Sequence, residues 1–273
     1  NKPTGDIILF HHCLNDVNSF ENGDIQSRYF TILPSWLKKQ GIKVYGLPWL
    51  FNNRPSINFY KNLRKTNTLI PEDWLNLYDY FNIFKNSFKS LKTLNYGILY
   101  PGAKLNCLIF REKLNQFGNQ SVIFWRYIPA IQKWSKELNS IVAYDIYQNL
   151  MFEHPIRYII KKLPIKSITL GYNHCLTSKE FMGYQHLLSE WDSPIKPDYV
   201  LCMGKSGINF LSKQGIPEKK LISAADLKKF NSEDENLKKK PTKQLLILLS
   251  MTNEFILETL TKIHLNNDFI VNE

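Results

Sequence analysis

Long hydrophobic runs and the commonest nucleotide-binding and hydrolase motifs are missing from this 273-residue sequence. Its apolar runs are strand-sized and fall well short of the roughly 20 residues that a membrane-spanning helix needs. A P-loop, a G-x-G-x-x-G fingerprint and a G-x-S-x-G nucleophile elbow are also absent. The sequence therefore supports neither a spanning helix nor a function assigned from one of these motifs.

Cysteine is scarce, and the four residues present are widely spaced with no C-x-x-C pair: Cys13, Cys107, Cys175 and Cys202. Each stands at or beside an apolar run, where a reduced thiol behaves as a small hydrophobe. This usage predicts core or near-core thiols of a cytosolic protein, and it favours neither disulfides nor a metal site.

Acidic residues are outnumbered, with 24 of them against 35 lysines and arginines, which gives a formal net charge of +11. Most of the positive charge is lysine scattered along the chain, so a solvated surface is the first interpretation. The alternative is a basic face that attracts a nucleotide, an anionic lipid or a nucleic acid. Nucleic acid is the least supported of the three, because no zinc finger, RNP motif or helix-turn-helix accompanies the charge.

What the sequence does contain is a repeated strand–loop–helix pattern. Short apolar runs at 140–144, 166–172 and 198–204 each end in a polar or glycine-containing turn, and helix-length stretches lie between or after them. Residues 6–10, 28–40 and 42–47 form a similar strand, helix and strand, with Gly41 ending the helix. This alternation predicts an α/β protein with a Rossmann-like, doubly wound parallel sheet over residues 1–225.

Two segments depart from that pattern. Residues 55–138 are predicted to be a largely helical insertion whose aromatic stripe packs into a core; the stripe comprises Trp74, Tyr78, Phe81, Phe84 and Phe88. Residues 226–243 have the composition of a linker, and 244–263 read as a strand and a helix. One such pair cannot bury its own apolar faces, so it either packs onto the first sheet or begins an incomplete second α/β domain at 244–273.

Ligands of open parallel sheets bind beyond the carboxyl ends of the strands, so the polar residues there are the candidates for function. They are His11, His12, Asn15, Asp16, Glu153, His154, Asn173 and His174. Glu153 near a helix start suits a base, a nucleophile or a ligand of a sugar hydroxyl, or simply a carboxylate that stabilises the helix. His174 suits proton transfer or phosphate binding, or a purely structural role.

Several of these segments together resemble bacterial surface-carbohydrate biosynthesis proteins of the GT-B glycosyltransferase type. The resemblance rests on residues 147–157, on Gly171-Tyr172-Asn173-His174, on 196–204 and on 214–221. They are similar to the family's "Y-E-x-Q-P-W-E", "G-Y-Q-H", "P-D-x-V-L-x-x-G" and "G-x-P-x-x-R" patterns. Gln148 stands where the family has Glu, and Ser27-Arg28-Tyr29-Phe30 resembles its "S-R-Y-W" helix.

The resemblance implies the acceptor-side half of a two-domain enzyme, with the nucleotide-sugar-binding domain beginning at 244. It implies sugar transfer from a nucleotide sugar to a glycan or lipid-linked acceptor of a capsule- or O-antigen-like polysaccharide, without metal or other cofactor. The expected location is cytoplasmic, with peripheral contact to an anionic inner-membrane surface as the alternative.

The same resemblance suggests roles for single residues. Glu153 or Asp16 would be the acidic catalytic group, and His174 or His12 would carry a proton or contact a phosphate. Arg28 would reach an anionic group, and the remaining substrate contacts would be His11, Asn15, His154, Tyr172 and Asn173. Two other hypotheses stay open: a non-catalytic sugar-binding or scaffold module, and an epimerase or hydrolase built on the same architecture.

Overall fold

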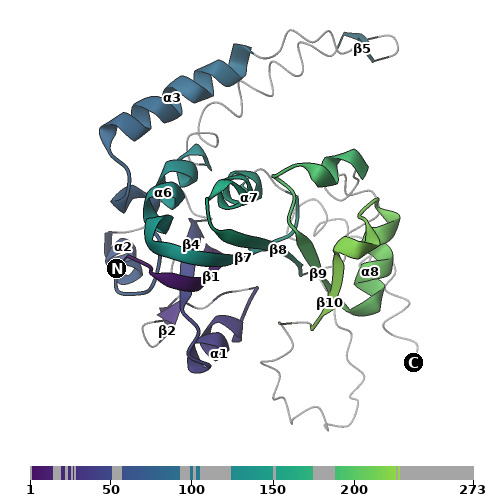
Figure 1. The fold of residues 1–273 in the computed structure, drawn as a ribbon, viewed down its shortest axis with the longest axis horizontal. Helices are drawn as coiled ribbons and strands as arrows, with labels where there is room; N and C mark the ends of the chain where they lie inside the picture. Colours follow the sequence, from purple (N-terminus) through teal and green to yellow (C-terminus); the bar gives the residue numbers. More distant parts are fainter. Residues whose placement is uncertain are drawn as a thin grey trace, which may run out of the picture. The chain divides into compact units, whose positions relative to one another are not determined.

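A six-stranded, all-parallel sheet forms the centre of the described part of the protein in the computed structural model (Figure 1). The structure describes residues 2–14, 20–21, 24–25, 27, 29–50, 57–92, 99–100, 103–104, 124–149, 152–174, 188–225 and 227. All of them belong to the compact unit Asn1–Ser232. The predicted linker beyond 227 and the predicted strand and helix at 244–263 lie outside the described residues.

The strands of the sheet follow one another in the order β10-β9-β8-β7-β1-β4. Their bounds are β1 (Gly5–Leu14), β4 (Val44–Leu50), β7 (Leu138–Ile146), β8 (Lys166–Asn173), β9 (Tyr199–Met203) and β10 (Leu221–Ala224). Every neighbouring pair is parallel. The predicted α/β class with a Rossmann-like parallel sheet is therefore confirmed.

The order of connection reverses at β1, which pairs with β4 on one side and with β7 on the other. Beyond β4 the chain passes through α2 (Ile57–Leu63) and returns to the sheet edge, where Thr68 makes a parallel bridge to Gly46. Two backbone hydrogen bonds of 2.8 Å form this bridge, from Gly46 N to Asn67 O and from Leu69 N to Gly46 O. Thr68 thus occupies the place of the third strand in the Rossmann order 3-2-1-4-5-6.

The first strand is longer than its apolar run suggested. β1 continues to Leu14 because its pairing with β4 continues to the match of Leu14 with Leu50, whereas its pairing with β7 ends at Phe10 and Tyr144. The expectation that His11 and His12 follow the strand is therefore wrong: both are strand residues on the stretch of β1 that extends past β7.

Three of the sheet's helices pack on one face. Helices α6 (Tyr127–Trp134) and α7 (Glu153–Lys162) cover β1 and β7, and their shared core includes Leu9, Ile131 and Ile159. α7 ends at Lys162 because Leu163, which precedes Pro164, has an extended backbone. α8 (Gly204–Lys213) continues the layer over β9 and β10.

In the described part of the chain, α1 (Leu33–Lys39) covers the opposite face of the sheet, over Phe10 and Val44. It begins later than the predicted residue 28, because Thr31 has a positive φ of 41° that does not fit a helix. Gly41 ends the helix with a φ of 78°, as predicted for a C-cap.

Helices dominate the described part of the insertion between β4 and β7, as predicted. Besides α2 and α6 it holds α3 (Leu77–Lys92), the short helices η1 (Pro71–Asp73) and η2 (Ser135–Glu137), and the two-residue strands β5 (Leu99–Tyr100) and β6 (Ala103–Lys104). The remaining elements are β2 (Phe20–Glu21), β3 (Asp24–Ile25), η4 (Leu188–Asp192) and η5 (Glu218–Lys220). No helix among the described residues is long and apolar enough to cross a bilayer.

The prediction that the aromatic stripe of α3 packs into a core is wrong. Tyr78, Phe81, Phe84 and Phe88 are 70%, 64%, 48% and 57% exposed, and only Trp74, before the helix, is packed against the main core. The buried side of α3 carries Asp79, Ile83 and Ser87 instead. Helical spacing identified the stripe but not whether its side chains pack against the rest of the protein.

Candidate functional site

The candidate site lies at the carboxyl ends of β1, β7 and β8, beside the point where the strand order reverses. It is built around the polar loop that follows β7, residues 147–149, and the start of α7. Open α/β sheets bind their ligands at such a switch point, because the two neighbouring connections leave in opposite directions there. The loop begins on the sheet, since Tyr147 N donates a 2.9 Å hydrogen bond to Tyr172 O.

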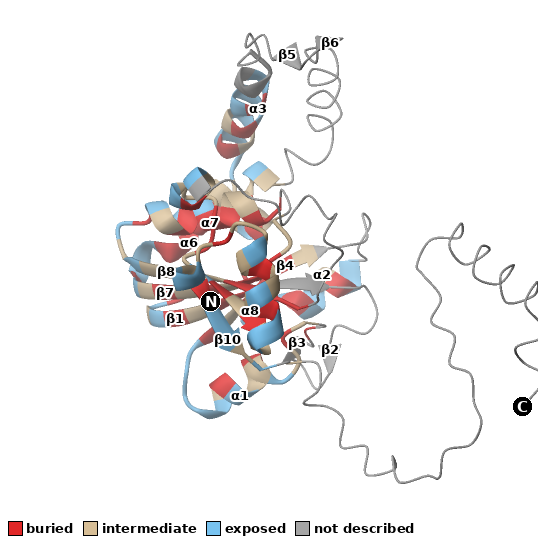
Figure 2. Cartoon of the chain, turned by 90° about the vertical axis from the view of Figure 1, so that its right-hand side faces the viewer, coloured by how far each residue is buried: buried red, intermediate tan, exposed pale blue. Residues whose placement is uncertain are grey.

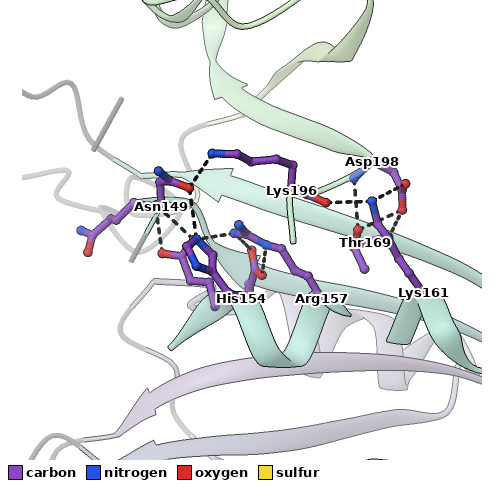
Figure 3. A network of polar contacts seen from close by, with 10 residues as sticks. Asn149, His154, Arg157, Lys161, Thr169, Lys196 and Asp198 are labelled. Carbon is purple, nitrogen blue, oxygen red and sulfur yellow. Dashed lines mark hydrogen bonds and ion pairs between the residues drawn. The ribbon is translucent and has the colours of Figure 1, made fainter. Parts of the chain in front are cut away.

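A buried ionic network holds α7 to β7 just below this loop (Figure 3). Arg157 donates from Nε and Nη2 to the two carboxylate oxygens of Asp145, at 2.6 and 2.8 Å. The same Nη2 donates to Glu153 Oε2 at 2.5 Å, and the three side chains are 0–6% exposed. Burial alone would lower the pKa of Arg157, but the two carboxylates outweigh that effect and raise it. Arg157 is therefore a permanent cation between two carboxylates.

Glu153 connects this network to the loop. Its two carboxylate oxygens accept hydrogen bonds from the backbone N–H groups of Gln148 and Asn149, at 3.0 and 3.1 Å. Asn149 has a left-handed φ of 56°, a conformation that asparagine tolerates better than most residues. The carboxylate thereby fixes the backbone of the loop and, as predicted, stands at the beginning of a helix.

The side chain of Asn149 is held in place by two basic groups (Figure 3). Lys196 Nζ donates to Asn149 Oδ1 at 3.0 Å, and His154 Nε2 lies 3.2 Å from the same oxygen. Lys196 is only 3% exposed and is also paired with Glu190 at 3.1 Å. Burial lowers the pKa of the Lys196 ammonium.

Gly171 allows the segment that carries Lys196 to approach the sheet. A Cβ at this position would lie 3.0 Å from Tyr147 Cβ and 3.3 Å from Pro197 Cγ, closer than ordinary packing permits. The absence of a side chain on β8 therefore lets Tyr147 and Pro197 close over the strand. The Lys196 side chain can then reach Asn149, which is 47 residues away in the sequence.

The site continues towards β8 through His174, which is 6% exposed. Its Nε2 lies 3.4 Å from Gln148 Nε2, and its ring centroid lies 4.3 Å from that of Tyr29. An imidazole can accept, donate or transfer a proton, so His174 adds a titratable group to the amides of the loop.

His11 lies towards β4 in an aromatic environment. Its ring centroid is 5.7 Å from Phe152, 6.2 Å from Tyr127 and 6.4 Å from Trp49. Phe152 directly precedes Glu153, so its contact with His11 places His11 near Glu153. Gln148 contacts both Glu153 and His174. The three residues therefore lie along one edge of the sheet, as the parallel strand pattern predicted. His11 is 3% exposed.

The other predicted site residues are placed less favourably for ligand contact, or lie outside the described residues. Tyr172 is fully buried against α1, where its hydroxyl accepts a 3.1 Å hydrogen bond from Leu227 N, and Asn173 is fully buried at the end of β8. His12 lies opposite Pro48 in the strand register, and its side chain is outside the described residues, as are Asn15, Asp16 and Arg28.

Sequence reasoning missed several of the residues that build the site: Tyr29, Asp145, Gln148, Asn149, Arg157 and Lys196. The four-residue spacing of Glu153 and Arg157 on one helix was a usable signal for an ion pair. Asp145 interrupts an apolar strand, which was a second signal, because a carboxylate buried there needs a partner. Nothing in the sequence around Lys196 pointed to Asn149.

This arrangement suits a polar, hydroxyl-rich ligand. It provides side-chain amides and imidazoles, whereas the carboxylates of Asp145 and Glu153 are buried in hydrogen bonds and that of Glu190 is paired with Lys196. Within the described ranges, no three His, Cys, Asp or Glu residues are grouped to hold a metal ion.

A cavity of about 430 Å³ lies away from this site, in the insertion between β4 and β7. It is lined by Ile57, Tyr60, Lys61, Arg64, Ile70 and Glu72.

Comparison of the chain with protein-family models, with curated proteins and with solved structures found no match.

Proposed function

We propose that this protein is the acceptor-side part of a GT-B-type glycosyltransferase of bacterial surface-polysaccharide synthesis, and that a sugar binds at the carboxyl edge of its sheet. The observation that carries the proposal is the loop of Gln148 and Asn149, whose backbone is held by Glu153. Lys196 and His154 also hold the Asn149 side chain. Amides of a loop ordered in this way can exchange hydrogen bonds with sugar hydroxyls at little entropic cost, because the loop is ordered before the ligand arrives.

In glycosyl transfer, a hydroxyl oxygen of the acceptor bonds to the anomeric carbon of the donor sugar. The bond to the leaving nucleotide phosphate breaks, and the hydroxyl proton passes to a base. His174 and His154 are the described imidazoles beside the loop, and His174 is the proton acceptor that we propose. Asp16 remains a second candidate for the base, and Arg28 for an anion contact. The nucleotide sugar would be bound by a domain that begins near residue 244.

Glu153 has a different role in this proposal from the one the family resemblance suggested. Its carboxylate is fully buried and accepts hydrogen bonds from two backbone N–H groups and from Arg157. A base must reach the proton that it removes. We therefore assign Glu153 as a positioning residue, which orients Gln148 and Asn149.

A second candidate function is a sugar-binding or scaffold module that does not catalyse transfer. The observation that favours it is the same engagement of Glu153, since its buried carboxylate does not reach a ligand at the loop. The two candidates share the sugar site and differ in turnover.

Calorimetric titration of the purified chain with a panel of monosaccharides and disaccharides tests the shared site. Asn149→Ala should weaken binding about two- to tenfold, because a lost hydrogen bond to a bound hydroxyl commonly costs about 0.5–1.5 kcal/mol. Asn139→Ala is the matched control, since Asn139 is exposed near the start of β7, at the other end of that strand. Equal affinity of both variants for the best ligand, or no binding of any sugar, would rule out the site.

Turnover of nucleotide sugars by the longest available form of the protein separates the two functions, with lipid-linked and free glycans as acceptors. His174→Ala should lower kcat by about a hundredfold or more if His174 carries the proton. Glu153→Gln should mainly raise KM, because it disturbs the loop rather than the proton transfer. Unchanged turnover in both variants would refute the catalytic assignment, and sugar binding without any turnover would favour the non-catalytic module.

A further inference from the structure

Helix α3 exposes its most apolar side to solvent. Leu77, Phe81, Phe84 and Phe88 are 88%, 64%, 48% and 57% exposed, and Tyr78 is 70% exposed. At about 100° per residue, the first four fall within about 60° of one another around the helix axis, so they form one stripe. Contiguous exposed apolar surface of this kind marks an interaction site more often than scattered residues do. We call these five residues the α3 stripe.

The first turn of α3 is joined to α6 on the side of the helix opposite the stripe. Asp79 is 8% exposed, forms an ion pair with Lys133 of α6, and accepts a 2.7 Å hydrogen bond from Asn76 N. Ile83 and Ser87 are buried on the same side. Figure 2 shows both buried (red) and exposed (pale blue) parts along α3. In the described part of the chain, the stripe thus lies on the side of α3 away from its ion pair with α6 and from its buried positions.

Positive charge flanks the stripe. By helical position, Lys85, Lys89 and Lys92 fall at about 60–120° around the axis from Leu77, on the side of the stripe that also holds Tyr78. Among the described side chains of these three, that of Lys85 is exposed. The acidic residue of α3, Asp79, lies on the side opposite the stripe. The two acidic residues just before the helix are already paired with arginines, Asp73 with Arg64 and Glu72 with Arg126. The exposed side of α3 is thus apolar and cationic.

We propose that the α3 stripe docks on the surface of an anionic lipid bilayer. A helix with aromatic and leucine side chains on one side and lysines beside them lies in the interface between headgroups and acyl chains. The phenyl rings enter the interface, while the lysine stems extend to the lipid phosphates. A second copy of the chain is a poorer occupant, because pairing two stripes would bring lysines of like charge together.

Flotation of the purified chain with vesicles tests this surface. Vesicles that contain phosphatidylglycerol should bind the protein at least about tenfold better than pure phosphatidylcholine vesicles, and added salt should weaken the binding. The double variant Phe81→Ser/Phe84→Ser should lose about tenfold or more in affinity, because two rings no longer enter the interface. Lys85→Gln should lose roughly fivefold, which is the usual effect of one lysine near such a surface.

Matched substitutions on other helices separate a local effect from a general one. Trp36→Ser removes an exposed aromatic side chain from α1, and Lys213→Gln removes an exposed lysine from α8; both should bind vesicles as well as the unchanged chain does. Circular dichroism and the thermal midpoint should stay the same in Phe81→Ser/Phe84→Ser, because both rings are largely exposed.

Three outcomes would overturn the proposal. The first is the absence of binding to anionic vesicles, and the second is equal loss of binding in the α1 and α3 variants. The third is a dimer, seen by light scattering, that Phe81→Ser/Phe84→Ser converts to a monomer, because the stripe would then be a self-association surface.

Discussion

Arg157 and Asp145 join helix α7 to strand β7 through two hydrogen bonds of 2.6 and 2.8 Å, and their side chains are only 1% and 6% exposed. Bidentate geometry of this kind gives both strength and orientation to a buried pair. Because Arg157 also binds Glu153, which holds the loop at Gln148 and Asn149, a single guanidinium connects the sheet to the candidate site.

Arg157→Met should destabilise the protein by about 3–5 kcal/mol, because it leaves two carboxylates buried without their cation. The free energy of unfolding in urea measures this loss. Arg64→Met is the matched control: the Arg64–Asp73 pair has the same chemistry and a 2.6 Å contact, but its side chains are 58% and 36% exposed. Water already screens that pair, so its loss should be several times smaller. Equal losses would show that the buried network does not stabilise the fold.

Asn149→Ala should be less stable than Asn149→Gly by roughly 1 kcal/mol. Both variants lose the oxygen that contacts Lys196 and His154, so that loss cancels in the comparison. The remaining difference is the cost of placing a Cβ at a φ of 56°, which glycine avoids. Urea unfolding of the two variants side by side measures it, and an alanine variant as stable as the glycine variant would mean that the loop abandons its left-handed turn.

Asp198 should make the stability of the protein depend on pH in the acid range. Burial alone would raise the pKa of this carboxyl, but hydrogen bonds from Thr169 and the Lys161 ammonium, 2.9 Å away, outweigh it and lower the pKa. A lowered pKa means that the ionised group stabilises the fold above its ordinary value of about 4, and that this stability is lost as the pH falls through the lowered value.

Asp198→Asn should therefore cost on the order of 1 kcal/mol at pH 7, a figure reduced by partial exposure to solvent. The difference from the unchanged protein should shrink steadily below about pH 4. Urea unfolding at several pH values tests this, and a difference that stayed constant down to pH 2 would contradict the proposed charge effect.

Cys202 should resist alkylation in the folded protein. The thiol is fully buried on β9, and burial raises its pKa to about 11, so only about 0.1% would be thiolate at pH 8. Iodoacetamide treatment followed by peptide mass spectrometry should find Cys202 unmodified in buffer and fully modified in urea. Rapid modification in buffer would mean that β9 opens readily.

Local patterns were enough to predict the strand-and-helix order of this chain. Gly41 ends a helix at the predicted residue, and Glu153 stands at the start of one. Boundaries were harder to predict: β1 extends beyond its apolar run to Leu14, because pairing with β4 supplies backbone hydrogen bonds that no local pattern encodes.

The candidate site was predicted in outline, because parallel strands bring their carboxyl ends to one edge of a sheet and polar residues follow those ends. This argument located His11, Glu153, His154 and His174. It could not find Lys196, since that residue precedes its strand and reaches Asn149 only because Gly171 leaves room above β8.

By itself, the sequence determined the parallel α/β class, the helical insertion and the strand ends at which polar groups gather, because those depend on the periodicity of apolar residues and on turn chemistry within short segments. Only the tertiary structure decided that Glu153 is buried by Arg157 and the loop, and that the aromatic side of α3 faces solvent. Both results depend on which surfaces meet across long stretches of chain, and a helical period specifies a face without specifying its partner.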